Sequence, residues 1–325
     1  MTKTEPRIPT RQGVLEAARK VAAILPPTPL LPLTIDGQQV WIKAECLQPV
    51  GAFKIRGAWH RLSALSEEER VAGVVAVSSG NHAQGVAWAA HRLGMAATIV
   101  MPADAPPIKL ERTRELGAEV VTYDRYNESR EEIAEAIAAE KGATYCHAFA
   151  DPWVIEGQGS AAIEIAEQLA AVGAPPVSRI VVCCGGGGLT AGLALACPEA
   201  EVVPVEPEGW DDVGRSLAAG EICRVADNAP PTACDALQTL ATSPLNFAVL
   251  RERCPFGLSV SEAEVQDAQR LAFARLRLVL EPGGTVALAA ALAGKAKCDG
   301  TTVIMATGGN VDPHQFARVL EASPR

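Results

Sequence analysis

Short runs of apolar, β-branched residues alternate along the chain with longer segments rich in alanine. The runs at 71–79, 96–102 and 118–124 have the composition of strands. The segments 81–94 and 106–117 between them have apolar residues at helical spacing. The order strand, helix, strand, helix, strand is typical of βαβ units with short connections, and it predicts a parallel sheet.

A second series of the same kind follows. Strands are predicted at 179–184, 201–208 and 301–310, and a helix at 185–196 follows the first of them. Two further helices are predicted over 160–172 and 262–275. The two series separate near residues 151–159. We therefore expect an α/β fold with two open, twisted parallel-sheet lobes and a cleft between them.

Four glycine-rich turns, SSGNH, CGGGGL, EPGGT and ATGGN, punctuate these series. In open parallel sheets, ligands bind beyond the carboxyl ends of the strands, where such turns lie. The turn Gly185–Gly188 follows a predicted strand and opens a predicted helix, a setting that favours binding of a phosphate. Gly186, Gly188 and Ala191, with Glu206 ending the next strand, also fit a loose dinucleotide fingerprint, so an NAD-binding oxidoreductase is an alternative.

A lysine stands in an unusual setting in the segment PVGAFKIRGA. Lys54 follows Phe53 in an otherwise apolar stretch bounded by glycines. Desolvation lowers the pKa of a lysine and makes its neutral amine available as a nucleophile or base. The competing interpretation is a lysine that extends from a helix start into solvent.

Composition narrows the classes of protein. The 325 residues are 48% hydrophobic and 21% charged with a net charge of −9, which excludes disorder and disfavours nucleic-acid or anionic-membrane binding. The apolar stretch at 285–294 is about half of the ~20 residues that a membrane span needs. No export signal is expected at the N-terminus, and nine cysteines without ligand spacing indicate reduced thiols. These features predict a cytoplasmic metabolic protein.

The motifs GAFKIRGA, SSGNHAQG, GGGGL, EPGG and ATGGN stand in the order and spacing of a known family. From about Pro29 to Asp312 the chain resembles the fold-type-II pyridoxal-phosphate enzymes, and most of all the threonine/serine dehydratases and serine racemases. The resemblance implies a tryptophan-synthase-β-like fold with pyridoxal 5'-phosphate in the cleft and a homodimer. It divides the chain into a large cofactor-binding domain, 1–48 with 150–325, and a small mobile domain, 49–149.

By the same resemblance, Lys54 forms the Schiff base with the cofactor aldehyde and Phe53 packs against the ring. Asn81 bonds the ring hydroxyl, Thr307 faces the pyridine nitrogen and Glu281 lies near the ring. The backbone of five residues holds the phosphate: Gly185, Gly186, Gly187, Gly188 and Leu189. A departure from the family is Ala52, where a serine is often found.

The resemblance also implies residues that bind the substrate carboxylate: Ser78, Ser79, Asn81, His82, Arg130 and Thr239. Ser79 matches the residue that supplies the opposite-face proton in racemases. Helix capping is the competing explanation for the serines, and a solvated helix face for Arg130. The other histidines, at 60, 91, 147 and 314, form no cluster and are predicted to be structural or surface residues.

A divalent cation is a further expectation. Glu206 and Asp212 flank a tight loop that can turn two carboxylates and the Trp210 carbonyl toward Mg²⁺ or Ca²⁺. The racemases and some dehydratases resemble the chain at these positions. A loop with solvated acids is the alternative.

Together these features predict a pyridoxal-phosphate-dependent ammonia-lyase that converts L-threonine or L-serine to a 2-oxo acid. A hydroxyl at Thr307 does not hold a proton on the pyridine nitrogen, which favours β-elimination over transamination. A serine racemase or a 3-hydroxyaspartate dehydratase shares every motif and stays open. The short segment after ATGGNVD predicts the short, catabolic form, without a regulatory domain.

Overall fold

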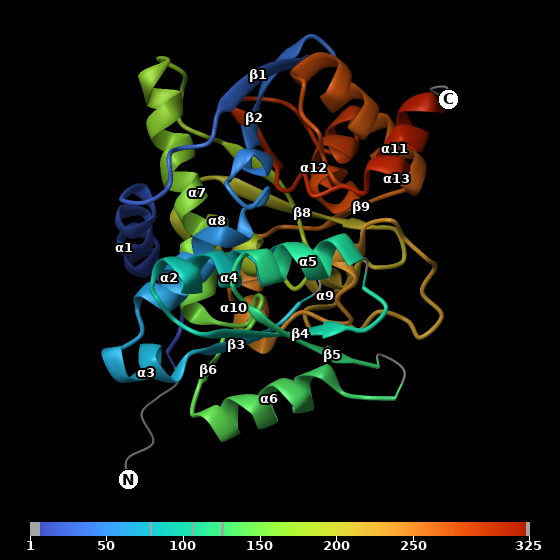
Figure 1. The fold of residues 1–325 in the computed structure, drawn as a ribbon. Helices are drawn as coiled ribbons and strands as arrows, with labels where there is room; N and C mark the ends of the chain where they lie inside the picture. The colour runs from blue at the N-terminus through green and yellow to red at the C-terminus, as the bar shows by residue number, and fades with distance from the viewer. Residues whose placement is uncertain (1–6, 79, 106, 125–126, 323–325) are drawn as a thin grey trace.

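The chain forms two sheets joined by helices (Figure 1). The computed structural model describes residues 7–78, 80–105, 107–124 and 127–322. The larger sheet has the strand order β1-β2-β10-β7-β8-β9, and the smaller has the order β5-β4-β3-β6. All neighbouring strands are parallel except β1 and β2. The strands are β1 (Leu30–Ile35), β2 (Gln38–Ala44), β3 (Val74–Val77), β4 (Ala97–Pro102), β5 (Glu119–Tyr123), β6 (Thr144–Tyr145), β7 (Arg179–Cys183), β8 (Glu201–Pro207), β9 (Leu258–Val260) and β10 (Thr302–Ala306).

Helices cover both sheets. Figure 1 shows α4 and α5 on one side of β3–β5 and α6 on the other. In the larger unit, α8 and α12 pack against the central strands. The α-helices are α1 (Arg11–Ala22), α2 (Lys54–Ser63), α3 (Glu67–Ala72), α4 (Asn81–Arg92), α5 (Pro107–Glu115), α6 (Arg130–Lys141), α7 (Pro152–Ala171), α8 (Gly188–Ala196), α9 (Asp212–Ala219), α10 (Pro244–Arg253), α11 (Glu262–Leu271), α12 (Pro282–Leu292) and α13 (Pro313–Glu321). Short turns of helix are η1 (Glu45–Leu47), η2 (Asp235–Leu237) and η3 (Ala272–Leu276).

The cores follow from the apolar patterns. The central strands of the larger sheet are buried along almost their whole length, as expected for a parallel sheet covered on both faces. Their Val and Ile side chains pack with the alanines of α8 and α12 into one cluster. A second cluster lies between α2, α4 and the smaller sheet. The predicted α/β class with two parallel-sheet lobes is confirmed.

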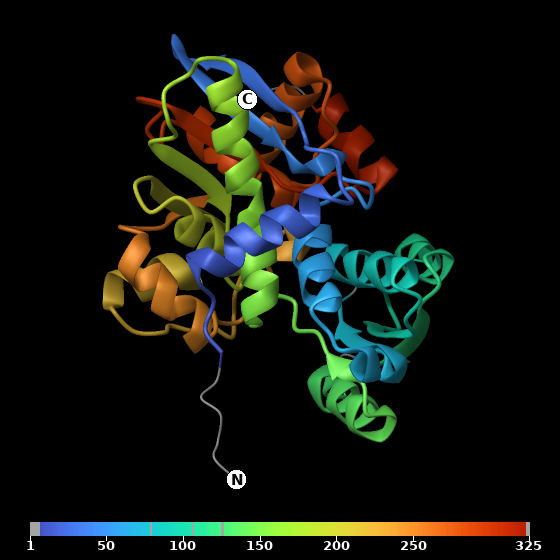
Figure 2. The same cartoon turned by 90° about the vertical axis from the view of Figure 1, so that its left-hand side faces the viewer.

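The predicted helix over 160–172 begins earlier in the structure. Helix α7 starts at Pro152, with Asp151 as its N-cap, and runs over 20 residues to Ala171, so the segment that separates the two strand series is mostly helical. Its glycines mark close helix packing: a Cβ at Gly157 would lie 2.5 Å from Gly57, and one at Gly159 would lie 2.4 Å from the Gly192 carbonyl oxygen. Helix α7 therefore joins α2 and α8, and Figure 2 shows it running beside the larger sheet, with the smaller unit to one side.

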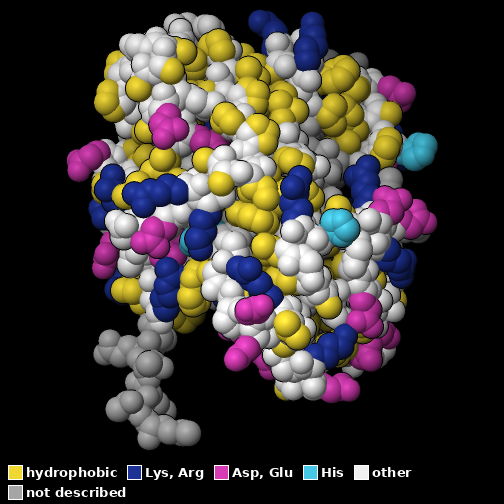
Figure 3. All heavy atoms as spheres, turned by 60° about the vertical axis from the view of Figure 1, so that its left-hand side comes forward, with side chains coloured by type: hydrophobic (Ala, Val, Ile, Leu, Met, Phe, Trp, Pro, Cys, Tyr) yellow, Lys and Arg dark blue, Asp and Glu magenta, His cyan; other side chains and the backbone are white. Residues whose placement is uncertain are grey.

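The domain limits at 48/49 and 149/150 stay a prediction, although every strand of the smaller sheet lies between 74 and 145. On the face seen in Figure 3, hydrophobic side chains gather over the upper part, while charges of both signs are dispersed over the lower part. Within the described ranges, no helix combines the length and the apolar character needed to cross a bilayer.

Candidate active site

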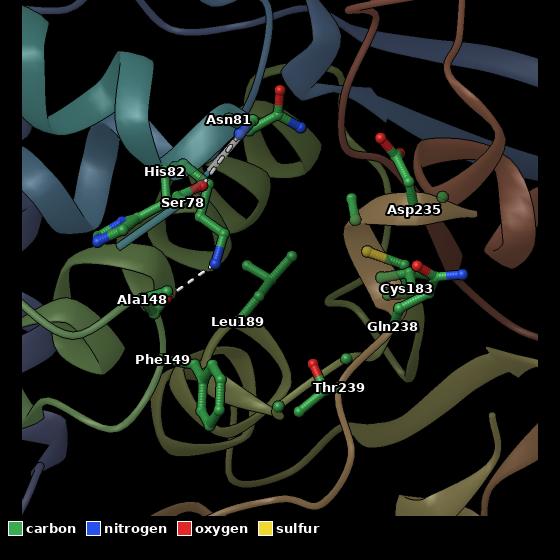
Figure 4. A pocket seen from close by; sticks show the side chains of 18 of the residues that line it. Ser78, Asn81, His82, Ala148, Phe149, Cys183, Leu189, Asp235, Gln238 and Thr239 are labelled. Atoms are coloured by element: carbon green, nitrogen blue, oxygen red, sulfur yellow. Dashed lines mark hydrogen bonds between the residues drawn. The ribbon is translucent and has the colours of Figure 1, made fainter. Parts of the chain in front are cut away.

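A cavity of about 410 Å³ lies where the carboxyl ends of strands from both sheets meet. Figure 4 shows its side chains: Ser78, Asn81 and His82 come from the smaller unit, and Asp235, Gln238 and Thr239 line the opposite wall. The cavity brings together most of the predicted site residues: Phe53, Lys54, Ser78, Asn81, His82, Arg130, Gly185, Gly186, Gly187, Gly188, Leu189, Thr239, Glu281 and Thr307.

Lys54 begins helix α2, and its amine lies in the cavity wall. Its Nζ donates to the Ala148 carbonyl oxygen at 2.8 Å and lies 5.3 Å from the centre of the Phe53 ring. Burial is the largest influence on this amine and lowers its pKa to about 8. Arg56, fully buried, donates to carboxylates of η1 and α7 and so fixes the first turn of α2. The amine is thus held in place with its neutral form accessible near neutral pH.

Asn81 and Glu281 join the two units inside the cavity. Asn81 is 8% exposed at the start of α4, and its Nδ2 donates to Glu281 Oε1 at 2.5 Å. A Cβ at Gly308 would lie 1.8 Å from that oxygen, so this contact requires glycine there. Burial raises the pKa of Glu281 to about 7.

The glycine turn between β7 and α8 forms the floor of the cavity. Gly187 caps α8 with a φ of +88°, which favours glycine. A Cβ at Gly186 would lie 2.4 Å from the Phe149 ring. Asn246 and Thr242 donate to the Gly186 carbonyl oxygen and hold the turn. The first N–H groups of α8 have no partner within the helix, so this turn is suited to an anion such as a phosphate.

Thr307 follows β10 and is 2% exposed. Its hydroxyl lies 3.1 Å from Cys183 Sγ, and its carbonyl oxygen accepts from the Phe53 backbone N–H at 3.1 Å. The loop before Lys54 is therefore tied directly to the end of β10.

Two histidines in the cavity are uncharged near neutral pH. Burial, with the nearby charge of Lys54, lowers the pKa of His82 to about 3 and that of His147 to about 4. His82 Nε2 lies 3.0 Å from the Cys146 carbonyl oxygen. The Nδ1 of His147 accepts the backbone N–H groups of residues 149 and 150. His147, expected from the sequence to be a structural or surface residue, lines the cavity instead.

The predicted carboxylate-binding residues have different surroundings. Ser78 Oγ accepts from the Gly80 N–H at 3.1 Å, so it caps a turn and also lines the cavity. Arg130 reaches the cavity from the first turn of α6, half-exposed and paired with Glu131 at 2.7 Å. Thr239 lies across the cavity (Figure 4). Ser79 lies outside the described residues.

Glu206 and Asp212 do not line the cavity. Glu206 lies near the end of β8, and Asp212 begins α9. Both are fully buried, and burial followed by their mutual repulsion raises the pKa of Glu206. The two Glu206 oxygens accept the backbone N–H groups of Val213 and Gly214, so they are not free for a ribose, and this speaks against the dinucleotide alternative.

The expected cation stays a prediction. Asp212 Oδ2 accepts from the Thr242 N–H at 2.8 Å, while its Oδ1 is buried without a partner, as in a site that gains from a bound cation. Trp210 Nε1 donates to the Pro230 carbonyl oxygen. In the part of the chain that is described, no group of three His, Cys, Asp or Glu side chains has metal-binding geometry.

Several residues of the site carry no local sequence signal. Phe149, in a loop, and Asn246, in the first turn of α10, shape the glycine turn from distant parts of the chain. Lys109 of α5 pairs with Asp235 of η2 at 2.6 Å in the cavity lining. Asn310 had a signal, since it ends the ATGGN turn next to Thr307. It lines the cavity and donates to Asn81.

Comparison with known proteins agrees with this geometry. Residues 21–308 match the family described as "Pyridoxal-phosphate dependent enzyme". An L-threo-3-hydroxyaspartate ammonia-lyase of Pseudomonas sp is 42% identical over 95% of this chain and 97% of its own. A serine racemase of Schizosaccharomyces pombe is 38% identical over 96% of this chain and 98% of its own. The crystal structure of a threonine deaminase of T.th. is 42% identical, with a TM-score of 0.86 over 94% of this chain and 99% of that one.

Proposed function

The chain belongs to the family of pyridoxal-phosphate-dependent enzymes, and from that premise we propose that it is an ammonia-lyase. It takes a 3-hydroxy amino acid, with L-threonine or L-serine as first substrates, and releases a 2-oxo acid and ammonia. The observation that carries the proposal is the desolvated amine of Lys54, which faces the same cavity as Asn81, the glycine turn and Thr307.

The cavity fits this cofactor. Gly185–Gly188 supply the anion site, and the glycine at 186 is required because a Cβ there would meet Phe149. The Lys54 amine lies within the same cavity for bonding to an aldehyde, and Asn81 and Thr307 offer polar groups to a ring. Bound pyridoxal phosphate supplies an aldehyde that condenses with amines and a ring that withdraws electrons from the α-carbon.

Lys54 is the proton-transfer group of the proposed reaction. Its pKa of about 8 leaves a useful neutral fraction at neutral pH, so Nζ can remove the substrate α-proton. The C–O bond to the β-hydroxyl then breaks, and the hydroxyl leaves with a proton as water. Hydrolysis of the remaining C–N bond consumes one water and gives the 2-oxo acid and ammonia, so the net change is loss of ammonia. His82 and His147, with lowered pKa values, do not compete for the proton.

Thr307 supports elimination rather than amino transfer. Its hydroxyl lies 3.1 Å from the Cys183 thiol, a group that does not ionise at neutral pH because burial raises its pKa to about 11. No negative charge at this position stabilises a proton on the ring nitrogen. A weak electron sink favours prompt loss of the β-hydroxyl.

The substrate carboxylate has candidate partners in the cavity. Ser78 and the N-terminus of α4 lie on one wall, and Thr239 lies on the other. Arg130 supplies a positive charge from the smaller unit, although Glu131 competes for it. We assign the carboxylate to the α4 side, because the first N–H groups of α4 lack intrahelical partners and attract an anion.

A second candidate substrate is 3-hydroxyaspartate. It is supported by the 42% identity to an L-threo-3-hydroxyaspartate ammonia-lyase. The lining of the cavity also includes Arg224, a cation that suits a second carboxylate. Racemisation of serine is supported by the 38% identity to a serine racemase and depends on Ser79.

A substrate panel with a lysine variant tests the proposal. The purified protein, loaded with pyridoxal phosphate, should release 2-oxo acid from at least one of L-serine, L-threonine and L-threo-3-hydroxyaspartate. Lys54→Ala should reduce this rate by at least about 10³-fold while its circular dichroism spectrum is unchanged, because covalent and proton-transfer roles are lost together. Lys295→Ala is the control, because it removes a lysine whose ion pair with Glu264 lies at the surface. Near-normal turnover by Lys54→Ala would contradict the assignment.

A further inference from the structure

We propose that Asn310 is a positioning residue that fixes the orientation of the Asn81 side-chain amide, so that Asn81 offers its NH₂ group to the cavity. The inference rests on the proposed function, because the group that Asn81 meets there is the cofactor. Asn310 ends the ATGGN turn, three residues after Thr307.

The argument starts at a backbone carbonyl. Asn310 Nδ2 donates to the Val50 carbonyl oxygen at 2.9 Å and to Asn81 Oδ1 at 2.8 Å. A carbonyl oxygen only accepts, so the Asn310 atom that faces Val50 must be the nitrogen. That nitrogen carries two hydrogens, and these two contacts use both.

The orientation of Asn81 follows from this. Asn310 presents a donor, so Asn81 must turn its oxygen toward it, and the NH₂ group of Asn81 must point the other way. On that side it donates to Glu281 Oε1 at 2.5 Å. The reverse orientation would set NH₂ against NH₂ and the amide oxygen against a carboxyl oxygen.

The backbone holds Asn310 in place relative to Lys54. Gly51 has a φ of +72°, and a Cβ there would lie 2.6 Å from Asn310 Oδ1, so only glycine permits this approach. The Gly309 N–H donates to the Gly51 carbonyl oxygen at 2.9 Å. The loop that leads into Lys54 and the turn that carries Asn310 are therefore one connected unit.

The consequence concerns the polarity that Asn81 presents. With its oxygen engaged by Asn310, Asn81 acts toward the cavity as a donor only. A donor stabilises an electron-rich oxygen on the bound ring, whereas an amide oxygen in the same place would repel it. The side-chain hydrogen bonds of Asn310 go to Val50 and Asn81, whereas that of the Lys54 amine goes to Ala148, so Asn310 acts through Asn81.

The test is a double-mutant cycle read by cofactor binding. Asn310→Asp keeps the size of the side chain but removes both donors, so Asn81 should reverse. The dissociation constant of pyridoxal phosphate, titrated into apoprotein, should rise about tenfold, and the visible absorbance maximum of the bound cofactor should shift. In an Asn81→Ala background, Asn310→Asp should change the dissociation constant by less than about twofold. Asn228→Asp, an exposed asparagine, is the matched control.

Two results would overturn the inference. One is that Asn310→Asp binds pyridoxal phosphate with the same dissociation constant and the same absorbance spectrum as the wild type. The other is an equal loss in the Asn81→Ala background, which would show that Asn310 acts through Val50 alone. If Asn310→Asp does not fold, Asn310→Ala replaces it in the same cycle and should show a smaller loss of the same sign. A wild-type protein that binds no cofactor would instead contradict the proposed function itself.

Discussion

At the scale of single residues, burial decides the charge state of the groups around Lys54. It lowers the pKa of the Lys54 amine and of both cavity histidines and raises that of Glu281. The result is a site with few full charges near the amine at neutral pH. This suits a base that must be neutral to accept a proton.

Glu281 gives a pH-dependent test of this burial. Its pKa of about 7 in the folded state lies above the ordinary glutamate value, so folding takes up a proton between about pH 4.5 and 7. The stability that this proton provides is complete below the unfolded pKa and is lost as the pH rises through about 7. The unfolding free energy of the apoprotein should therefore fall more steeply from about pH 5 to 8 in the wild type than in Glu281→Gln. Urea unfolding across this range measures it, with Glu111→Gln as an exposed control. Parallel curves would contradict the raised pKa.

Thr307 gives a spectroscopic test. Thr307→Asp should hold a proton on the ring nitrogen, slow the elimination and produce a long-wavelength absorbing species when substrate is added. Thr307→Ser, which keeps the hydroxyl, should retain the wild-type spectrum. Stopped-flow absorbance compares the two variants. Unchanged spectra and rates in Thr307→Asp would mean that Thr307 does not meet the ring.

At the scale of elements, the N-terminus of α9 is connected to the glycine turn. Asp212 accepts from the Thr242 backbone N–H, and the Thr242 hydroxyl donates to the Gly186 carbonyl oxygen. A cation bound at the unpartnered Oδ1 of Asp212 would neutralise the charge that repels the buried Glu206 carboxylate. It would also steady the turn that holds the phosphate.

The cation is tested by its removal. Mg²⁺ or Ca²⁺ should raise the thermal midpoint of the chelator-treated protein. At a hundredfold excess of the ion over its dissociation constant, binding should add about 2.7 kcal/mol to the free energy of unfolding. Asp212→Asn keeps an acceptor for Thr242 but should abolish the response, whereas Asp211→Asn, its more exposed neighbour, should keep it. Calorimetric scans with and without each ion give the comparison. If neither ion changes the thermal midpoint of the wild type, the cation is contradicted, and Glu206 and Asp212 only cap the start of α9.

Elements with strong periodicity could be predicted from the sequence. The strands β3, β4, β5, β7, β8 and β10 and the helices α4, α5 and α8 match the expected segments within a few residues. The start of α7 was missed because Gly157 and Gly159 look like a loop locally, and their role is contact with helices far away in sequence. The antiparallel pair β1 and β2 was missed because Pro32 stands inside the apolar run of β1 and argues against a strand, and because β2 opens with two glutamines.

At the scale of the whole molecule, two units meet around the cavity, and an ion pair in the cavity lining joins them. Lys109 of α5 and Asp235 of η2 form this pair, with Nζ and Oδ2 2.6 Å apart. Both partners are partly exposed, so the pair contributes less than about 1 kcal/mol to stability. Because the pair joins the two units beside the cavity, we expect it to affect ligand binding more than stability.

Lys109→Met should therefore raise the KM for substrate severalfold and leave the unfolding free energy within about 1 kcal/mol of the wild type. High salt should raise the wild-type KM in the same direction, because it screens the pair. Lys141→Met is the matched control, since Lys141 pairs with Glu119 within the smaller unit. Steady-state kinetics measures the effect, and equal KM values in both variants would contradict it.

The site could be predicted as far as its motifs extend. Lys54, Asn81, Gly185–Gly188 and Thr307 stand in local patterns, and they converge on one cavity. Phe149, Thr242 and Asn246 could not be predicted, because they reach the glycine turn from distant parts of the chain without a pattern of their own. The homodimer, the cytoplasmic location and the role of Ser79 stay predictions.

The central claim is that Lys54 is the lysine that bonds the cofactor. Borohydride reduction of the protein loaded with pyridoxal phosphate, followed by peptide mass spectrometry, tests it most directly. We predict one pyridoxyl-phosphate mass addition, on Lys54 and on no other lysine, that substrate amino acid prevents when it is added before the reductant. A reduced adduct on a different lysine, or none on Lys54 in protein that retains activity, would contradict the account.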